Sequence, residues 1–193
     1  MIQVIGLVLI AIFSENMVLA RCLGMDWPKR KDMTEDSAWH IGVSITLVMV
    51  VAALISWLMN VCILRFFGVE QFRVLAYTLA VLLAVALLKQ LLRLFFPVLH
   101  QHLDEYLSQT VYNCAVLGVA FIITLRNYSL PQTLLYALAS GVGVLGVLVI
   151  FTGMQDQASF DNCPKVFRGL PIQLITAGLM ALALMGFYGL NVT

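Results

Sequence analysis

Two polar interruptions inside apolar segments hold the residues of this sequence that are most able to do chemistry. The first combines Glu15 and Asn16 with Cys22 a few residues later, and the second combines Asn113 with Cys114. An asparagine amide in an apolar environment needs hydrogen-bond partners, and a thiol there is a soft metal ligand. Asn113 follows Asn16 by 97 residues, about half of the 193-residue chain. This spacing predicts that the two interruptions are equivalent and that function lies where they meet.

Each of these side chains has a functional and a structural interpretation. A carboxylate such as Glu15 inside a membrane span indicates a functional site by default, because burying a charge is expensive. It could equally lie near the outer interface or cap a half-helix. Asn16 and Asn113 are candidates for an ion pathway, and we expect them to satisfy backbone groups freed where a helix breaks. Cys114 alone would be a small buried hydrophobic residue, but its place in the repeated interruption favours a metal ligand.

The composition places these interruptions in a membrane. The chain is 62% hydrophobic and 11% charged, with a mean hydropathy of +0.97, whereas soluble domains carry roughly 25% charged residues. A formal net charge of +1 gives no basic surface for nucleic acid. The four cysteines are far apart, so a disulfide framework is not expected. The sequence contains no Ser/His/Asp set, catalytic carboxylate pair or phosphate loop, and we expect no catalytic residue on the chain itself.

Six apolar segments are long enough to cross a bilayer, which requires about 20 residues each. They lie at residues 2–23, 41–64, 74–92, within 106–125, between 127 and 155, and within 169–193. A Gly-x-Gly-x-x-Gly match at residues 141–146 falls inside the fifth segment, where small residues indicate close helix packing and not a nucleotide site. Lysine and arginine residues gather after the first, third and fifth segments, which predicts that both termini face the outer side.

The same offset of 97 residues maps the third segment, 74–92, onto 171–189 in the sixth. The expected fold is therefore a single all-α membrane domain over residues 1–193. It has six transmembrane helices in two three-helix repeats, at about 1–97 and 98–193. Because each repeat has an odd number of helices, the second enters the membrane in the opposite sense. Polar breaks at matching places in such inverted repeats point to the central site, here in the first and fourth helices.

The residues around both interruptions resemble a known family of membrane subunits. The stretch Asn-Cys-Ala-Val-Leu-Gly-Val-Ala at 113–120 is similar to the fourth helix of the A subunits of Rnf electron transport complexes. The stretches Phe-Arg-Gly at 167–169, Leu-Ile-Thr-Ala-Gly-Leu-Met-Ala-Leu at 174–182 and Met-Gly-Phe at 185–187 resemble the C-terminus of those subunits. Glu-Asn-Met at 15–17, followed by Leu-Gly at 23–24, is similar to the first helix of the wider Rnf–Nqr membrane subunit family. The resemblance covers essentially the whole chain.

This resemblance implies a membrane subunit of an ion-translocating ferredoxin:NAD oxidoreductase, in a bacterial inner membrane. A homologous subunit, E in Rnf, would be inserted the other way up. The two partners would each supply two cysteines to a shared [2Fe–2S] cluster that relays electrons. Flavins and further iron–sulfur centres belong to other subunits, so the resemblance implies no flavin or nucleotide on this chain. Electron transfer is coupled to the movement of Na⁺ or H⁺, and the chain alone is not expected to be catalytic.

One position departs from the family pattern. The family's first-helix ligand is a cysteine two positions after Leu-Gly, and here that position is Asp26. Cys114 matches the second ligand directly. Cys22 lies four residues before Asp26, so in a helix it would share the face of Asp26 about 6 Å along the axis. Three outcomes stay open: Cys22 substitutes, Asp26 ligates as a carboxylate, or the cluster is absent. The alternative functions are an E subunit of the Nqr type and a metal-free inverted-repeat transporter, the second supported by Glu15 and Asp26.

Overall fold

The computed structural model describes residues 2–21, 23, 35–64, 72–95, 107, 110, 113–158 and 170–186. The elements in this part of the chain are helices, which confirms the all-α prediction. The α-helices are α1 (Ile2–Leu9), α2 (Glu35–Met59), α4 (Arg73–Phe95), α6 (Cys114–Leu125), α7 (Leu130–Ala158) and α8 (Leu170–Met185). Two π-helical segments, η1 (Ile10–Ser14) and η3 (Asn60–Leu64), continue α1 and α2.

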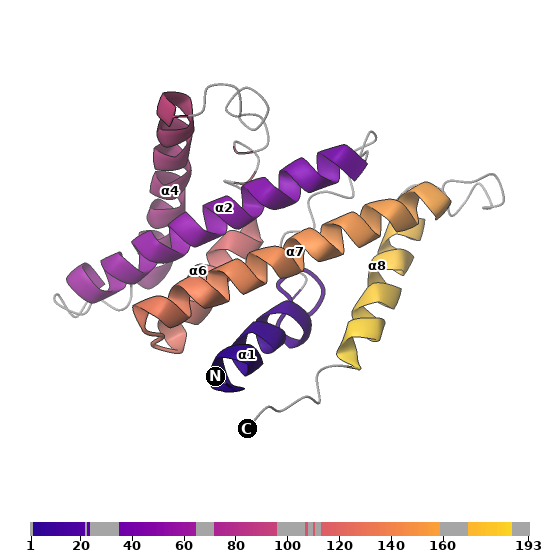
Figure 1. The fold of residues 1–193 in the computed structure, drawn as a ribbon, viewed down its shortest axis with the longest axis horizontal. Helices are drawn as coiled ribbons and strands as arrows, with labels where there is room; N and C mark the ends of the chain where they lie inside the picture. The colour runs from indigo at the N-terminus through magenta and orange to yellow at the C-terminus, as the bar shows by residue number, and fades with distance from the viewer. Residues whose placement is uncertain are drawn as a thin grey trace.

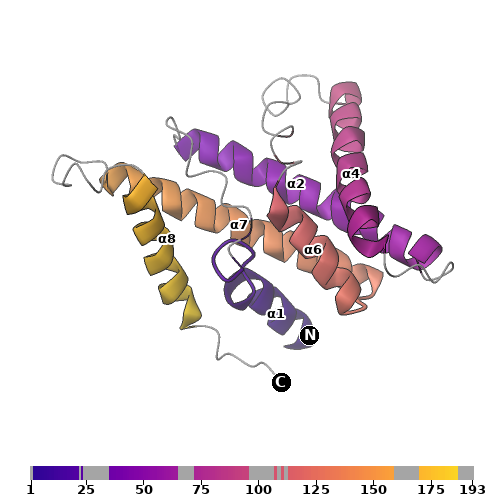
Figure 2. The same ribbon diagram turned by 180° about the vertical axis from the view of Figure 1, so that it is seen from behind.

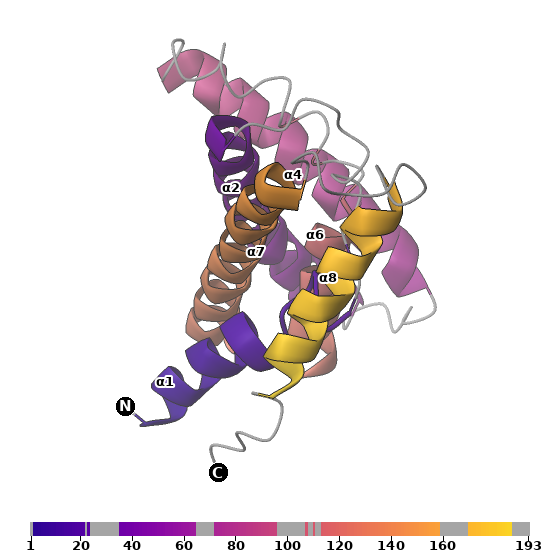
Figure 3. The same cartoon turned by 90° about the vertical axis from the view of Figure 1, so that its right-hand side faces the viewer.

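The two longest helices, α2 and α7, lie side by side at the centre of the molecule and run antiparallel (Figure 1). Gly42 of α2 packs directly against Leu145 of α7. Further along the pair, Trp57 Nε1 donates to the Tyr128 carbonyl oxygen just before α7, 3.1 Å away. α4 and α6 pack against α2, and α6 crosses the pair when it is seen from behind (Figure 2). η1 and α8 pack against α7, with α8 nearest the viewer in Figure 3.

Three helices are long and apolar enough to cross a membrane, at Ala38–Cys62, Val74–Leu94 and Leu130–Met154. Two further apolar helices, Cys114–Leu125 and Pro171–Met185, are shorter. The 12 residues of α6 extend only about 18 Å, against a hydrocarbon core of roughly 30 Å. Within the described ranges, the predicted second, third and fifth spans are therefore complete, and the first, fourth and sixth contain shorter helices.

Small residues lie inside the helix packing and large apolar residues lie outside it. Ala52, Ala53, Ala80 and Ala84 are fully buried where α2 and α4 face the rest of the bundle. The outward face of α4 carries exposed leucines at positions 75, 79, 82, 83, 87, 91 and 94. Such an arrangement is typical of a bilayer, where small interfacial residues let helices approach closely and the outer surface contacts hydrocarbon.

The glycine motif of α7 serves helix packing at two of its three positions. A Cβ atom at Gly141 would lie 2.6 Å from Thr46 Cγ2 of α2, and one at Gly143 would lie 3.2 Å from Asn16 Nδ2. The helix-packing interpretation is confirmed for these two residues. Gly146 has no atom within 4 Å of such a Cβ and faces open space.

Candidate functional site

The first helix ends at the polar interruption that stands out in the sequence. η1 stops at Ser14, and the Glu15 backbone N–H closes its last turn on the Ile10 carbonyl oxygen at 2.7 Å. Residues 15–21 contain no helix, so the predicted first span is helical only up to Ser14. A π-helical turn is a widened turn that is frequent at functional sites. It brings two polar side chains, Glu15 and Asn16, to the end of a 13-residue helical rod.

Asn16 satisfies the backbone at this break with both ends of its amide. Its Nδ2 donates to the carbonyl oxygens of Ile12 and of Gly143, each 3.1 Å away. Its Oδ1 accepts from the backbone N–H of Val18 at 3.1 Å and of Leu19 at 3.5 Å. The residue is 2% exposed. The predicted backbone-satisfying role of Asn16 is therefore confirmed, and the amide also joins the break to the middle of α7.

Asn113 plays the corresponding part at the second interruption. It is the N-cap of α6, in extended conformation, and its Oδ1 accepts from the Ala115 backbone N–H at 2.9 Å. Leu107 and Thr110 on the other side of the break are also helical. As with Asn16, the acceptor receives the N–H two residues further on. Asn113 therefore satisfies a backbone N–H at the break, as predicted.

The two interruptions meet on α6. Gly118, one turn after the start of this helix, lies against two residues that follow the first break. A Cβ at Gly118 would be 2.7 Å from Leu23 Cδ1 and 3.4 Å from Met17 Sδ. A side chain at this position would require the Leu23 side chain to shift. The expectation that the two segments meet is confirmed by this contact.

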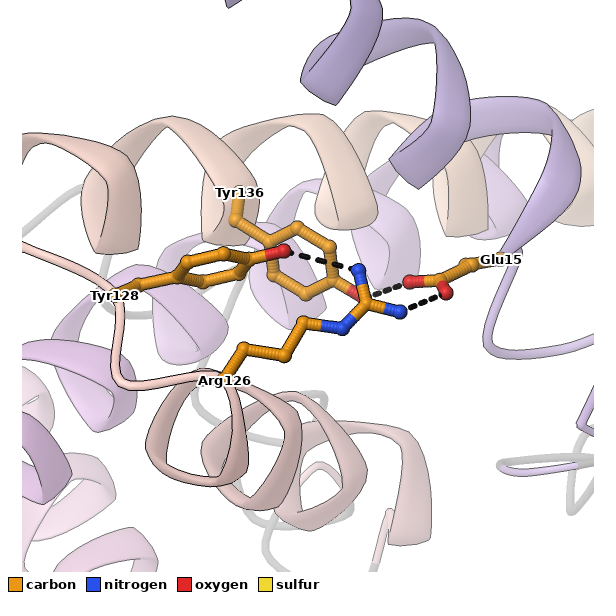
Figure 4. A network of polar contacts seen from close by, with 4 residues as sticks. All are labelled: Glu15, Arg126, Tyr128 and Tyr136. Atoms are coloured by element: carbon orange, nitrogen blue, oxygen red, sulfur yellow. Dashed lines mark hydrogen bonds and ion pairs between the residues drawn. The ribbon is translucent and has the colours of Figure 1, made fainter. Parts of the chain in front are cut away.

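Glu15 lies in a network of polar contacts that joins three elements (Figure 4). Its Oε1 forms an ion pair with Nη2 of Arg126, and its Oε2 accepts from the Tyr136 hydroxyl of α7 at 3.1 Å. Nη1 of Arg126 donates to the Tyr128 hydroxyl at 2.9 Å. The Tyr128 and Tyr136 rings lie 5.5 Å apart. The Glu15 side chain is 15% exposed and that of Arg126 is 42% exposed, so the carboxylate is paired and largely shielded from solvent.

The turn after α6 fixes the position of Arg126 and Tyr128. Arg126 is the C-cap, and Asn127 follows with a φ of 50°, the left-handed conformation that asparagine tolerates well. The backbone N–H of Asn127 bonds to the Thr124 carbonyl oxygen and that of Tyr128 to the Ile123 carbonyl oxygen. This pair of bonds is a Schellman motif. It ends α6 abruptly and turns the arginine toward the first break.

Arg126 remains a cation at this site. Its pKa is raised above the ordinary value, first by the hydrogen bond to the Tyr128 hydroxyl and further by the nearby carboxylate of Glu15. Partial burial acts in the opposite direction. Since arginine is protonated at all physiological pH values, the Glu15 charge has a permanent counter-charge. Nothing in the local sequence pattern around Arg126 signals a partner 111 residues away.

Cys114 is the first residue of α6 and is exposed. The candidate second ligands, Cys22 and Asp26, both lie outside the described residues. Within the described part of the chain, no three His, Cys, Asp or Glu side chains gather as a metal site. The thiol of Cys114 is chemically suited to be one metal ligand, and any further ligands would have to come from other parts of the chain or from a partner.

A cavity of about 550 Å³ lies beside Asn16, between η1, α7 and α8. Its described lining, apart from Asn16, consists of apolar side chains and glycines, among them Gly146, Ile150 and Leu179. Such a lining suits hydrocarbon and offers a cation few ligands. The polar network around Glu15 is accordingly the better candidate for binding an ion.

Comparison with known proteins adds a family to this geometry. The family described as "Rnf-Nqr subunit, membrane protein" matches residues 4–191. The chain is 37% identical to the A subunit of the ion-translocating oxidoreductase complex of Syntrophotalea carbinolica, over 93% of both chains. It is 33% identical to the A subunit of the Na⁺-translocating ferredoxin:NAD⁺ oxidoreductase complex of Acetobacterium woodii, over 94% of both. A third relative, the A subunit of the ion-translocating oxidoreductase complex of Aliivibrio fischeri, is 32% identical over 98% of this chain and 96% of its own.

Proposed function

The chain belongs to the Rnf-Nqr membrane subunit family, and we propose that it serves as the A subunit of an ion-translocating ferredoxin:NAD⁺ oxidoreductase complex. Similarity over nearly the full length of the chain to the A subunits of such complexes carries this conclusion. It also favours an Rnf-type complex over the Nqr-type alternative. The chain is a multi-pass membrane protein and part of an oxidoreductase, to which other subunits contribute the ferredoxin and NAD⁺ chemistry.

In the membrane, the chain is arranged as two inverted three-helix repeats, at about 1–97 and 98–193, with both termini on the outer side of a bacterial inner membrane. The two asparagines support this arrangement. At the offset of 97 residues, Asn16 and Asn113 each accept the N–H two residues further on, at the end of one helix and the start of another. A homologous subunit inserted the other way up completes the pair.

The electron-transfer role rests on the second break. Cys114, at the exposed N-terminus of α6, is one ligand of a [2Fe–2S] cluster shared with the homologous partner. Cys22 is the second ligand from this chain, in place of the cysteine that Asp26 replaces. When bound, such a cluster accepts and releases one electron at a time. Asn113 holds the first turn of α6 in place by accepting from the Ala115 backbone N–H.

The ion-transfer role rests on the first break. Glu15 supplies a carboxylate at the end of a half-helix, Asn16 ties that end to α7, and Asn113 caps the start of α6. Discontinuous helices of this kind use their ends and unwound carbonyls to bind coupling ions in inverted-repeat transporters. A metal-free transporter would use the same break without Cys114.

Iron content and low-temperature EPR of the purified complex test the electron-transfer role. We compare the wild type with Cys114→Ser, Cys22→Ser and, as a control, Cys62→Ser, which alters an exposed cysteine of η3. A reducible [2Fe–2S] signal that disappears in the first two variants and survives in the control supports the relay. A signal that survives Cys22→Ser but not Cys114→Ser moves the second ligand to Asp26 or another residue. If the wild type has no membrane-cluster signal, the metal-free alternative replaces the relay.

A further inference from the structure

The residues around Glu15 form a site that attracts cations. Glu15 follows the C-terminal end of the α1–η1 rod, and Arg126 caps the C-terminal end of α6. Helix C-termini carry partial negative charge and carbonyl groups without intrahelical partners. One such end carries Glu15 itself, and the other carries the arginine that reaches it. Tyr136 adds a hydroxyl to the same carboxylate, so a carboxylate, a hydroxyl and the partial negative charge of a helix end are available to a cation here.

The cation bound at this site in the structure is a side chain of the protein itself. The guanidinium of Arg126 contacts the Glu15 carboxylate through one nitrogen and the Tyr128 hydroxyl through another. The Arg126 side chain is 42% exposed and the Glu15 side chain 15%. The arginine thus lies between the exposed surface and the carboxylate. Its hydrogen bond to Tyr128 gives the guanidinium a second anchor, which it can keep when it leaves Glu15.

We propose that Arg126 is the gate of the cation path, bound to Glu15 in the closed state and released when a translocated Na⁺ or H⁺ takes its place. The exchange conserves charge, because one monovalent cation leaves the carboxylate as another arrives. Tyr136 stays on Glu15 as a neutral hydroxyl ligand in both states. This inference rests on the proposed ion-translocating function and names the residue that controls access to its site.

The position of Arg126 on α6 gives the gate a mechanical link to the second break. α6 begins with Cys114 and is capped by Arg126, so one 12-residue helix carries both residues at its opposite ends. A helix of this length moves as a rigid body. Any displacement of α6 that begins at Cys114 therefore shifts Arg126 relative to Glu15, which is held separately by the first break and α7.

A purely structural ion pair is the competing explanation, and a reversal of the two charges separates it from a gate. In Glu15→Arg/Arg126→Glu the attraction remains, but the carboxylate moves off the half-helix end and away from Tyr136. A structural pair works in either orientation. A cation site works only with its carboxylate at position 15.

The experiment uses the whole complex reconstituted in liposomes. Three quantities are measured: the rate of electron transfer from reduced ferredoxin to NAD⁺, the Na⁺ and H⁺ moved per electron, and the passive leak of each ion down an imposed gradient without ferredoxin. The variants are Arg126→Gln, Glu15→Gln, the neutral pair Glu15→Gln/Arg126→Gln and the charge-reversed pair. Arg93→Gln is the matched control, because it removes an exposed arginine from the last turn of α4.

We expect Arg126→Gln to raise the passive leak about tenfold and to lower the ions moved per electron, while electron transfer continues. Glu15→Gln and the charge-reversed pair should lose ion movement without a leak. The neutral pair leaves no unpaired buried charge, so it folds even where Arg126→Gln does not, and it should also lose ion movement. The ion whose leak and transport change, Na⁺ or H⁺, is the one that the site binds.

Two results would overturn the gate. One is that the charge-reversed pair moves the wild-type number of ions per electron, which would make the contact between Arg126 and Glu15 purely structural. The other is an Arg126→Gln complex, or a neutral pair, that behaves like Arg93→Gln in leak and transport. The proposed function fails separately: its failure is a wild-type complex that oxidises ferredoxin without moving either ion.

Discussion

The isosteric change of asparagine to aspartate should have opposite effects at the two breaks. Asn16 uses its amide nitrogen to donate to two carbonyl oxygens, each at 3.1 Å, and is 2% exposed. Asn16→Asp removes both donors and turns an oxygen toward these carbonyls. Asn113 uses its side chain as an acceptor for the N–H of Ala115. Asn113→Asp keeps that acceptor and adds a negative charge at a helix N-terminus.

The magnitudes follow from these contacts. Hydrogen bonds between helices in membrane proteins are worth about 0.6 to 1.7 kcal/mol, and a buried polar group left without a partner costs about 1–3 kcal/mol. Protonation of the new carboxyl group restores only one donor. Asn16→Asp should therefore destabilise the fold by about 2–3 kcal/mol. Aspartate caps helices about as well as asparagine, and its charge gains about 0.3–1 kcal/mol there, so Asn113→Asp should be neutral or slightly stabilising.

Thermal unfolding of the fluorescently labelled protein in detergent measures the difference in stability between the two variants. The readout is the fraction of protein that stays monodisperse after heating to each temperature. For a chain of this size, about 2–3 kcal/mol corresponds to a midpoint lower by about 4–12 °C. Asn113→Ala serves as a positive control, because loss of a cap costs about 1 kcal/mol. Equal midpoints for Asn16→Asp and Asn113→Asp would refute the assignment of donor and acceptor roles to the two amides.

Two further predictions concern the central helix pair. Gly141→Ala drives a methyl group into Thr46 and should destabilise the protein by about 1–3 kcal/mol. Gly146→Ala fills open space and should stabilise α7 by up to about 1 kcal/mol. The same heating assay should therefore lower the unfolding midpoint of the first variant and raise that of the second. Trp57→Phe keeps an aromatic ring but loses the 3.1 Å hydrogen bond to the Tyr128 carbonyl oxygen. This loss should lower the unfolding midpoint by an amount equivalent to about 1 kcal/mol. An unchanged midpoint would mean that water replaces the lost donor.

The helix breaks could be predicted because their cause is local. An asparagine in an apolar segment requires backbone partners, and the side-chain oxygens of Asn16 and Asn113 accept from N–H groups two or three residues further on. The helical character of the segments and the packing role of Gly141 and Gly143 could also be predicted, because composition and spacing are local properties of the sequence. The π-helical form of η1 left no trace in the sequence, since its apolar residues fit either helix type.

The network around Glu15 could not be predicted, because its partners come from distant parts of the chain. Arg126 and Tyr136 lie 111 and 121 residues away in sequence. Each also has an ordinary local interpretation, Arg126 as a charge at the end of an apolar segment and Tyr136 as a core aromatic residue. Only the packing of the first break against α7 and the end of α6 brings them to one carboxylate.

The two breaks share an asparagine but carry different chemistry. The neighbour before the asparagine is Glu15 in the first break and Tyr112 in the second, and the neighbour after it is the fully buried Met17 in the first and the exposed Cys114 in the second. The carboxylate and the thiol thus lie at different breaks. A coupling device on this chain must communicate between them.

Electrostatic interaction alone is too weak to couple the thiol to the carboxylate over the length of α6. Two unit charges about 18 Å apart interact by about 1 kcal/mol at an effective dielectric constant of about 20. Switching a site from almost fully closed to almost fully open requires about 5.5 kcal/mol. If the proposed function is right, an electron arriving near Cys114 can therefore bias the contact between Arg126 and Glu15 only slightly through space. The remainder must come from a displacement of the helix that carries Cys114 at its start and Arg126 at its end, and this displacement is the step on which ion movement in the proposed function depends.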